Sequence, residues 1–323
     1  MELDQATDGR VPRLRPIFYG VSRVGPGAPP KFVASVHSAE EELLGYVAID
    51  RLEPAPAWGP LLAHPGLSVD DACVLARAVS AQFSLYGIGR GSGHFLFTAG
   101  GGPGAEARRE EYLDALQSLA GRGILEIAFE DNGGGPELEA ARSGLVASAV
   151  AAVSTILAHV GVPAGGARVS QHLASSLSVE VAAVLERDGM CLPTGNGHSP
   201  SDVEVTLVGA PIWTLDDEWA RHASSRIVVS LGAARASAGA DRMLHERGVV
   251  FVPGAVAAGG ALAALALVKQ GKDPALATAM TAELTSRRVA EALELPDRPF
   301  PRAAEEFAAT VAGTRDGSSH DAR

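Results

Sequence analysis

Residues 82–94 read QFSLYGIGRGSGH, and the rest of the chain is interpreted outward from this stretch. Upstream, Ser68 followed three residues later by Asp71 is typical of a helix N-terminus, and apolar residues recur at helical spacing from there into the stretch. Glycines then occupy every second position from 87 to 93. This density predicts that the backbone leaves regular structure and closely approaches another group. The apolar run after His94 predicts a buried strand.

The composition indicates a globular protein large enough for two domains. Its 323 residues are 46% apolar and 20% charged, which suffices for two hydrophobic cores. The formal net charge of −11 argues against nucleic-acid binding and against attraction to an anionic membrane, because both need a basic surface. The two cysteines, Cys73 and Cys191, are too few for a disulfide framework, and the N-terminus lacks a signal-peptide pattern. We therefore expect a cytoplasmic protein.

The stretch from Gln82 to His94 resembles the substrate-site segment of the glutamate/leucine/phenylalanine/valine dehydrogenases. These enzymes carry a helix ending in Met-Thr-Tyr-Lys and then a glycine-rich turn ending in Gly-Gly-Gly-Lys. Their two lysines hold the substrate carboxylate and activate a water. The alignment needs no gap: Gln82 stands at the first lysine position and His94 at the second, with the family's spacing. The resemblance implies a conserved frame in which both lysines are replaced.

Further motifs of the family follow in the same order over roughly residues 40–295. The family has paired glycines that bind the substrate carboxylate after a Gly-Pro pair; this chain keeps Gly59 and Pro60 but has Ala63 and His64 instead of the paired glycines. The resemblance implies that Asp131 corresponds to the family's acid/base aspartate. It also implies that Arg235 replaces the asparagine near the nicotinamide.

The segment expected to bind a dinucleotide departs most from the family. A Gly-x-Gly-x-x-Gly turn lets a pyrophosphate approach a helix N-terminus, and an acidic residue after the next strand holds the ribose. After a short strand at residues 167–170, this chain has His172 and Ala174 at the two essential glycine positions. No carboxylate follows the strand at residues 190–192 until Asp202. We therefore predict that NAD binding is lost and that the protein has no cofactor.

The fold class predicted by the resemblance is α/β, with two domains around a cleft. An N-terminal mixed-sheet substrate and oligomerisation domain is expected at residues 1–138, and a degenerate, Rossmann-like doubly wound domain at residues 139–295. A C-terminal helix and disordered tail are expected at residues 296–323. Within the second domain we expect a helix at residues 211–222 and a strand at residues 225–231.

The candidate catalytic residues are His94 and Asp131, and the candidate substrate-binding residues are Gln82, His64 and Arg235. Imidazole transfers protons near neutral pH, so His94 and Asp131 form a candidate acid/base pair. Structural interpretations stay open: a turn cap for His94, a strand-end turn residue for Asp131, and a surface ion pair for Arg235. Scattered histidines are usually unrelated, so no metal site is predicted.

Three functions remain open. The first is a repurposed enzyme that has lost NAD-dependent oxidative deamination. It carries out cofactor-independent acid/base chemistry on an amino-acid-derived or 2-oxo-acid-like small molecule, bound in the interdomain cleft, in specialised biosynthesis. The alternative is a non-catalytic pseudoenzyme subunit or scaffold paired with another enzyme. The second alternative is an atypical NAD(P)-dependent amino-acid dehydrogenase. In each case we expect a homo-oligomer with no nucleic-acid or membrane partner.

Overall fold

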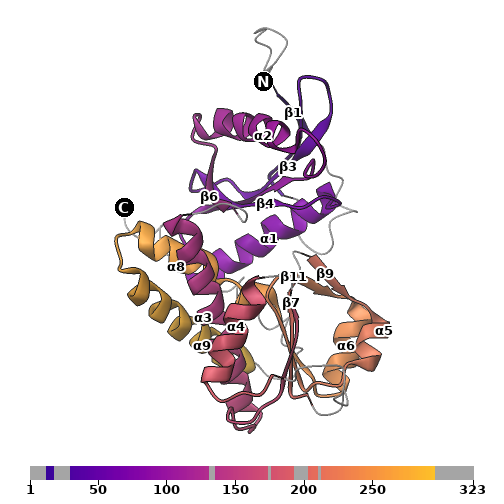
Figure 1. Ribbon diagram of the computed structural model, residues 1–323, viewed down its shortest axis with the longest axis vertical. Helices are drawn as coiled ribbons and strands as arrows, with labels where there is room; N and C mark the ends of the chain where they lie inside the picture. Colours follow the sequence, from indigo (N-terminus) through magenta and orange to yellow (C-terminus); the bar gives the residue numbers. More distant parts are fainter. Residues whose placement is uncertain are drawn as a thin grey trace, which may run out of the picture. The chain divides into compact units, whose positions relative to one another are not determined.

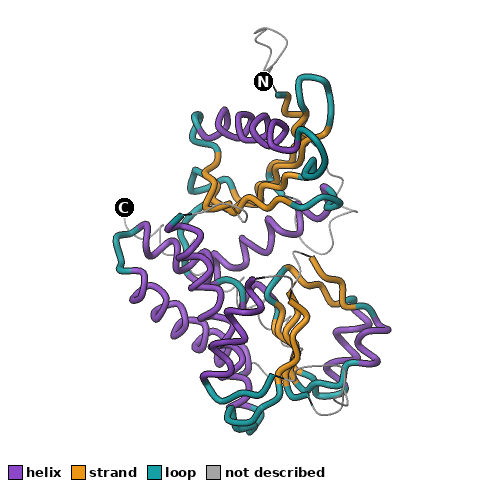
Figure 2. The backbone as a smooth tube through the Cα atoms, viewed as in Figure 1, coloured by secondary structure: helices purple, strands orange, loops and turns teal. Residues whose placement is uncertain are grey.

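The computed structural model describes residues 12–17, 30–130, 135–173, 176–192, 203–209 and 212–294. The chain divides into two compact units, Met1–Ser80 with Gly89–Leu138, and Ala81–Ile88 with Glu139–Arg323 (Figures 1 and 2). The first unit holds a mixed sheet and the second a parallel sheet. The predicted α/β class with two sheet-bearing parts is therefore confirmed. Residues 295–323, which include the expected C-terminal helix and tail, lie outside the described residues.

The first unit is built on one six-stranded sheet with the strand order β1-β2-β3-β5-β4-β6. Strands β1, β2, β3 and β5 pair with one another in antiparallel fashion, whereas β4 runs parallel to both β5 and β6. The strands are β1 (Arg13–Pro16), β2 (Phe32–His37), β3 (Leu43–Arg51), β4 (Ala57–Ala63), β5 (Gly91–Phe97) and β6 (Leu125–Glu130).

Two helices, α1 (Val69–Tyr86) and α2 (Ala105–Ala120), cover opposite faces of this sheet (Figure 1). Successive residues of a strand point to opposite faces, so β5 contributes to both cores. Phe95 and Phe97 pack in the core that includes Tyr112 of α2, whereas Leu96 packs with Cys73 and other residues of α1. The expected strand after His94 is confirmed, and it is buried on both sides.

The start of α1 has the capping arrangement that its sequence predicts. The backbone N–H of Ser68 donates to Asp71 Oδ2 over 2.7 Å, and the N–H of Asp71 donates to Ser68 Oγ over 3.3 Å. These reciprocal bonds satisfy donors that a helix leaves unpaired in its first turn. The helix then ends at Tyr86, and Gly87 follows with φ +72°.

The expectation that the whole glycine stretch leaves regular structure is wrong for its second half, because Gly91 and Gly93 lie within β5. Close packing of neighbouring strands explains the glycines there. A Cβ on Gly59 of β4 would lie 1.8 Å from the carbonyl oxygen of Gly93. A Cβ on Gly93 would lie 3.1 Å from the carbonyl oxygen of Ala48 on β3. The glycines permit a close approach, as expected, but between strands of one sheet.

The second unit contains a four-stranded parallel sheet with the order β12-β10-β8-β7, and a separate parallel pair, β9 with β11. The helix expected at residues 211–222 is wrong for its first half: residues 212–215 form strand β9, and only residues 217–222 form a helix, α5. The strands are β7 (Val169–Leu173), β8 (Val205–Gly209), β9 (Ile212–Leu215), β10 (Ile227–Ser230), β11 (Ala233–Ala236) and β12 (Val250–Val252).

Helix α3 is long and apolar enough by length and composition to cross a membrane, but 61% of its most apolar window is buried inside the protein. It packs closely on α8: a Cβ on Gly144 would lie 2.3 Å from the carbonyl oxygen of Gly260. The helices of the second unit, besides the end of α1, are α3 (Pro136–His159), α4 (Ser176–Arg187), α5 (Asp217–His222), α6 (Ala238–Glu246), α7 (Gly254–Ala257), α8 (Gly260–Lys269) and α9 (Pro274–Leu293).

Candidate functional site

His94 lies in the middle of β5, paired with Ala48 of β3, and its side chain faces α1. On the same face its neighbours along the strand are Ser92, which meets Ser80 of α1, and Leu96, which packs on the preceding turns of α1. His94 is therefore covered by the helix, and only 5% of it is exposed. The structure places this candidate catalytic residue in the core of the first unit.

Burial removes the imidazole of His94 from water and lowers its pKa from 6.5 to about 3, while a hydrogen bond at the backbone of Phe95 opposes the shift. The ring is therefore neutral at physiological pH. Its Nδ1 atom is buried and has no hydrogen-bond partner among the described residues. A buried polar atom without a partner is costly, so the site favours a small group that bonds to this nitrogen.

A polar cluster, made of Asp50, Ser80 and Ser92, joins β3, α1 and β5 on the same face as His94. The Ser80 hydroxyl donates to Asp50 Oδ2, and the Ser92 and Ser80 hydroxyls hydrogen-bond to each other. Ser92 is fully buried and Ser80 nearly so. None of these three residues is among the predicted site residues. The only sequence signal of the cluster is the alternation of Ser92 and His94 between glycines, which does not reveal the helix that covers them.

Beside this cluster, Trp58 of β4 is paired in register with Ser92. The Arg90 guanidinium lies 5.1 Å from the centre of the Trp58 ring, and its NH1 atom lies 2.9 Å from Glu126 Oε2 on β6. The Glu126 carboxylate is therefore neutralised within the chain. This row of side chains extends the polar face from β3 to the last strand of the sheet.

The structure does not bring His64 and His94 together. His64 follows β4, and its backbone N–H donates to the carbonyl oxygen of Phe97 over 2.9 Å. Because Leu62 pairs with Leu96, the two histidines are offset by four residues along neighbouring strands, which is about 13 Å. The Nδ1 atom of His64 is also buried and has no partner in the described part of the chain.

The other candidate residues lie elsewhere or outside the described residues. Gln82 is half-buried on the last turns of α1, which belong to the second unit. Arg235 lies on β11 opposite Thr214, and its side chain is not among those described. Asp131 immediately follows β6 and lies outside the described residues. No described group of three His, Cys, Asp or Glu side chains is arranged to hold a metal ion.

The dinucleotide segment is a strand where a glycine turn would be needed. Strand β7 continues to Leu173, with Gln171 and His172 paired to Leu207 and Val208 of β8. The His172 side chain is exposed. Only residues 174 and 175 separate this strand from α4, so the backbone of the first glycine position belongs to the sheet. The residues present do not fit a dinucleotide pyrophosphate, which needs a tight turn without side chains.

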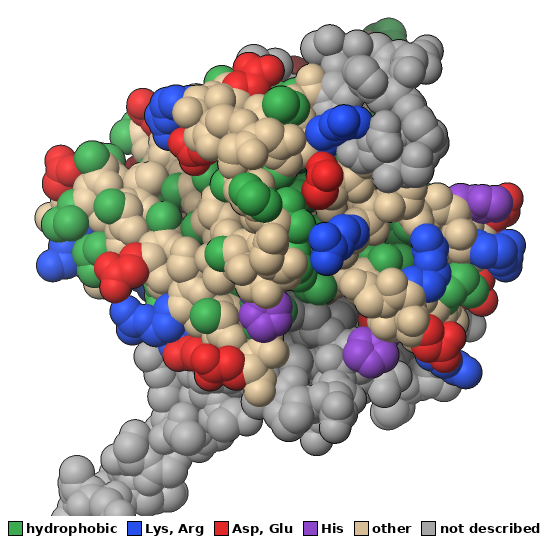
Figure 3. Space-filling model, turned by 90° about the horizontal axis from the view of Figure 1, so that it is seen from below, with side chains coloured by type: hydrophobic (Ala, Val, Ile, Leu, Met, Phe, Trp, Pro, Cys, Tyr) green, Lys and Arg blue, Asp and Glu red, His purple; other side chains and the backbone are tan. Residues whose placement is uncertain are grey.

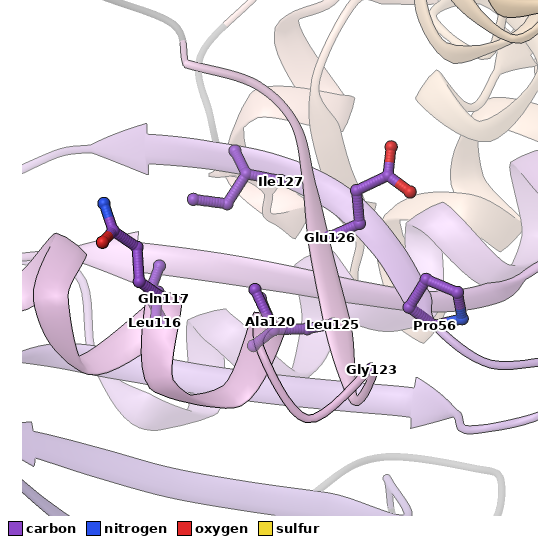
Figure 4. A pocket seen from close by; sticks show the side chains of 8 residues that line it. All are labelled: Pro56, Leu116, Gln117, Ala120, Gly123, Leu125, Glu126 and Ile127. Atoms are coloured by element: carbon purple, nitrogen blue, oxygen red, sulfur yellow. The ribbon is translucent and has the colours of Figure 1, made fainter.

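The first unit also has a hollow of about 300 Å³ between the end of α2 and β6 (Figure 4). Its walls are apolar except for Gln117 of α2 and Glu126 of β6. The lining residues are Pro56, Leu116, Gln117, Ala120, Gly123, Leu125, Glu126 and Ile127. The hollow lies beside the α2-facing core, so it is a separate feature from the buried face that holds His94.

The face of the molecule drawn in Figure 3 has no basic patch. There, Lys and Arg side chains are interspersed with Asp and Glu side chains, and none of the four types forms a continuous patch. This distribution agrees with the net charge of −11. Nucleic-acid binding needs clustered positive charge, which this face does not offer.

Comparison with solved structures shows which fold this is. A hetero-hexameric glutamate dehydrogenase of Thermus thermophilus, in its leucine-bound form, matches over 92% of this chain and 86% of its own, with a TM-score of 0.64 and 16% identity. A glutamate dehydrogenase of Peptoniphilus asaccharolyticus matches over 94% and 89%, with a TM-score of 0.64 and 12% identity. An L-tryptophan dehydrogenase of Nostoc punctiforme matches over 88% and 96%, with a TM-score of 0.61 and 16% identity.

No protein-family model and no curated protein matches this sequence. The structural similarity confirms the predicted resemblance to amino-acid dehydrogenases at the level of the fold. At these sequence identities the similarity shows the fold but not the function, since proteins of one fold have many functions.

Proposed function

We propose that this protein has the fold of an amino-acid dehydrogenase but does not carry out NAD-dependent oxidative deamination and holds no NAD. The observation that supports this most directly is strand β7, which extends to Leu173 through the position of the first fingerprint glycine. A pyrophosphate bound there would meet the His172 side chain and a backbone already bonded to β8. Gln82 and His94, in place of lysines, supply no fixed positive charge for a substrate carboxylate.

Calorimetric titration of the full chain with NAD(H) and NADP(H) tests this proposal. We expect no heat of binding at micromolar coenzyme. A crystal soaked with coenzyme is the complementary measurement. Micromolar binding, with the coenzyme lying across the parallel sheet, would contradict the proposal and restore the atypical NAD(P)-dependent dehydrogenase.

The function we propose is cofactor-independent acid/base chemistry on an amino-acid-derived or 2-oxo-acid-like small molecule, in a biosynthetic setting. The unpartnered Nδ1 of His94 supports it, because a ligand that donates a hydrogen bond there offsets the cost of burying that nitrogen. In this proposal His94 and Asp131 are the proton-transfer pair, and Gln82, His64 and Arg235 contact the substrate.

Single substitutions test the catalytic assignment. His94→Ala and Asp131→Asn are each expected to abolish turnover of the substrate while circular dichroism shows an intact fold. Glu126→Gln, a carboxylate substitution on β6 five residues before Asp131, serves as the control and is expected to leave turnover unchanged. Full activity in both site variants would refute the assignment.

A second candidate is a non-catalytic subunit or scaffold paired with another enzyme. Two observations favour it: His94 is only 5% exposed, and its pKa of about 3 makes it a poor proton acceptor at neutral pH. The glutamate dehydrogenase of Thermus thermophilus named above is a hetero-hexamer, which makes assembly with a second chain a reasonable model. Co-purification with a stoichiometric partner is the expected result, and an active homo-oligomer of this chain alone would exclude this candidate.

We further propose that the chain forms a homo-oligomer and works in the cytoplasm. The similarity to assembled dehydrogenases supports the first proposal. The presence of only two cysteines, which is typical of a reducing compartment, supports the second. Sedimentation of the purified protein and fractionation of cells measure the two properties directly.

A further inference from the structure

Helix α1 packs on the sheet of the first unit with small side chains. Its buried members of the cluster on this face are Ala72, Cys73 and Ala76. The larger side chains of Leu75 and Val79 are also buried, but they are not members of this cluster. Apolar contact stabilises in proportion to the area that it removes from water. The packing of α1 over β3 and β5 therefore contributes little stability for a helix of this length.

Helix α2, on the opposite face of the same sheet, is held by larger side chains. It contributes Tyr112, Leu116 and Leu119 to the buried cluster there. The Tyr112 hydroxyl also donates to the carbonyl oxygen of Tyr46 on β3 over 2.8 Å. The two helices that cover the sheet are thus attached unequally, and α1 is the one that separates from it at the lower cost in free energy.

The polar groups under α1 act in two directions. Ser80 attaches the helix to the sheet through its hydrogen bonds with Asp50 and Ser92. Against this, the Nδ1 atom of His94 is buried and has no partner among the described residues. Such an atom has lost the hydrogen bond that water supplies when it is exposed. The covered position of His94 therefore depends on the attachment at Ser80 and is opposed by the nitrogen that α1 covers.

The last turn of α1 is fixed separately, within the second unit. Leu85 and Tyr86 belong to a buried cluster of that unit. The Tyr86 hydroxyl donates to the carbonyl oxygen of Val256 over 2.6 Å, and Arg288 Nε donates to that of Leu85 over 2.8 Å. At the other end, residues 64–68 connect β4 to α1 and reach about 17 Å when extended. The N-terminal part of the helix can therefore leave the sheet while its last turn stays in place.

We propose that α1 is a lid over His94, and that residues 69–80 separate from β3 and β5 while the rest of the protein stays folded. Opening exposes His94 and Ser92 on one face of β5. Water or a ligand then bonds to His94 Nδ1, which offsets part of the cost of opening. The lid explains how a side chain that is 5% exposed meets a small molecule. It does not depend on which reaction His94 performs.

Cys73 reports the opening directly, because its thiol is fully buried between α1 and the sheet. An aromatic disulfide reagent added to the full chain reacts first with Cys191, which is exposed, and then with Cys73. The rate of the second phase is measured in increasing urea below the unfolding transition. A local opening exposes little surface and responds weakly to urea, whereas global unfolding responds strongly. We expect the weak response.

Two substitutions at this interface are expected to change the rate of the Cys73 reaction in opposite directions. Ser80→Ala removes the polar attachment and is expected to speed the reaction by on the order of tenfold. His94→Leu removes the unpartnered nitrogen and is expected to slow it by roughly threefold or more. Ser118→Ala, on the exposed side of α2, is the control, with the rate unchanged. Circular dichroism of each variant checks the fold.

Either of two results overturns the inference. One is a Cys73 reaction that follows global unfolding, with its full urea dependence from the start. The other is an unchanged rate in Ser80→Ala or in His94→Leu, which would mean that the polar groups under α1 do not control its separation from the sheet. None of these measurements depends on turnover. A lid that opens in a protein without activity would therefore support this inference and contradict only the catalytic proposal.

Discussion

At the scale of single residues, His94 combines a reactive side chain with a hydrophobic setting. An unfolded chain would protonate this histidine below a pH of about 6.5. In the folded protein, burial lowers the pKa of His94 to about 3. Between these values the unfolded state binds more protons than the folded state, so the free energy of unfolding decreases as the pH falls.

Acidification is therefore expected to destabilise the protein by up to ~1.4 kcal/mol per pH unit between pH 6 and pH 4 from this residue. Chemical denaturation at several pH values measures the slope. His94→Leu removes the titrating group and keeps an apolar volume, so its profile is expected to be flatter by that amount. If the free energy of unfolding changed with pH by the same slope in both proteins, a group other than His94 would cause the pH dependence.

The position of His94 was predictable from the sequence, but its burial was not. The spacing between Gln82 and His94 and the apolar run after His94 identify the segment and its strand. What determines the chemistry of His94 is α1, which covers its face of β5 with residues contributed from more than ten positions upstream. Burial of this kind comes from tertiary packing, which a local pattern does not encode.

At the scale of secondary-structure elements, α1 is attached to the first sheet by hydrogen bonds as well as by packing. Ser80 connects the helix to Asp50 on β3 and to Ser92 on β5. Replacing Ser80 by alanine leaves a fully buried hydroxyl on Ser92 with one partner fewer.

We expect Ser80→Ala to lower the free energy of unfolding by ~1–3 kcal/mol, because buried polar groups lose their partner. Urea denaturation measures the change. Ser118→Ala, on the exposed side of α2, is the matched control and is expected to stay within ~0.5 kcal/mol of the parent. If the Ser80→Ala protein were as stable as the control, the hydrogen bonds of the polar cluster would contribute nothing to the stability of α1 on the sheet.

Elements were predicted best where local signals and tertiary structure agree. The Ser68 and Asp71 cap, the strand after His94 and the parallel strands of the second unit were expected and are present. Residues 212–215 were expected as helix and form β9, because their partner strand β11 stabilises an extended backbone from 21 residues further along the chain. That pairing is long-range, and periodicity within residues 211–222 does not reveal it.

At the scale of the whole molecule, the buried apolar side chains of the described residues form four clusters, and the members of each cluster belong to one unit. In the second unit, α3 and α8 approach each other closely at Gly144. A Cβ on Gly144 would lie 2.3 Å from the carbonyl oxygen of Gly260 and 2.5 Å from the Cβ of Ala264. Both neighbours are fixed by the helix backbone, so the two helices must move apart to accept a larger residue.

Gly144→Ala is therefore expected to destabilise the second unit by ~2 kcal/mol or more, through overpacking. Amide exchange is expected to accelerate in α3 and α8, while the central strands β3 and β5 of the first unit keep their protection. Ser143→Ala, one residue away on an exposed position, is the control. Equal acceleration in both units would show that they open as one cooperative body.

The run of β7 to Leu173 also bears on how this protein arose and how it can be changed. Placing glycine at positions 172 and 174 would remove side chains, yet residues 171–173 would keep their pairing with β8. Under the proposed loss of NAD binding, point reversion is thus a poor evolutionary route back to redox chemistry. Libraries selected for coenzyme use are expected to yield insertions or deletions between Gln171 and Ser176, which reset the length of the connection, before they yield substitutions.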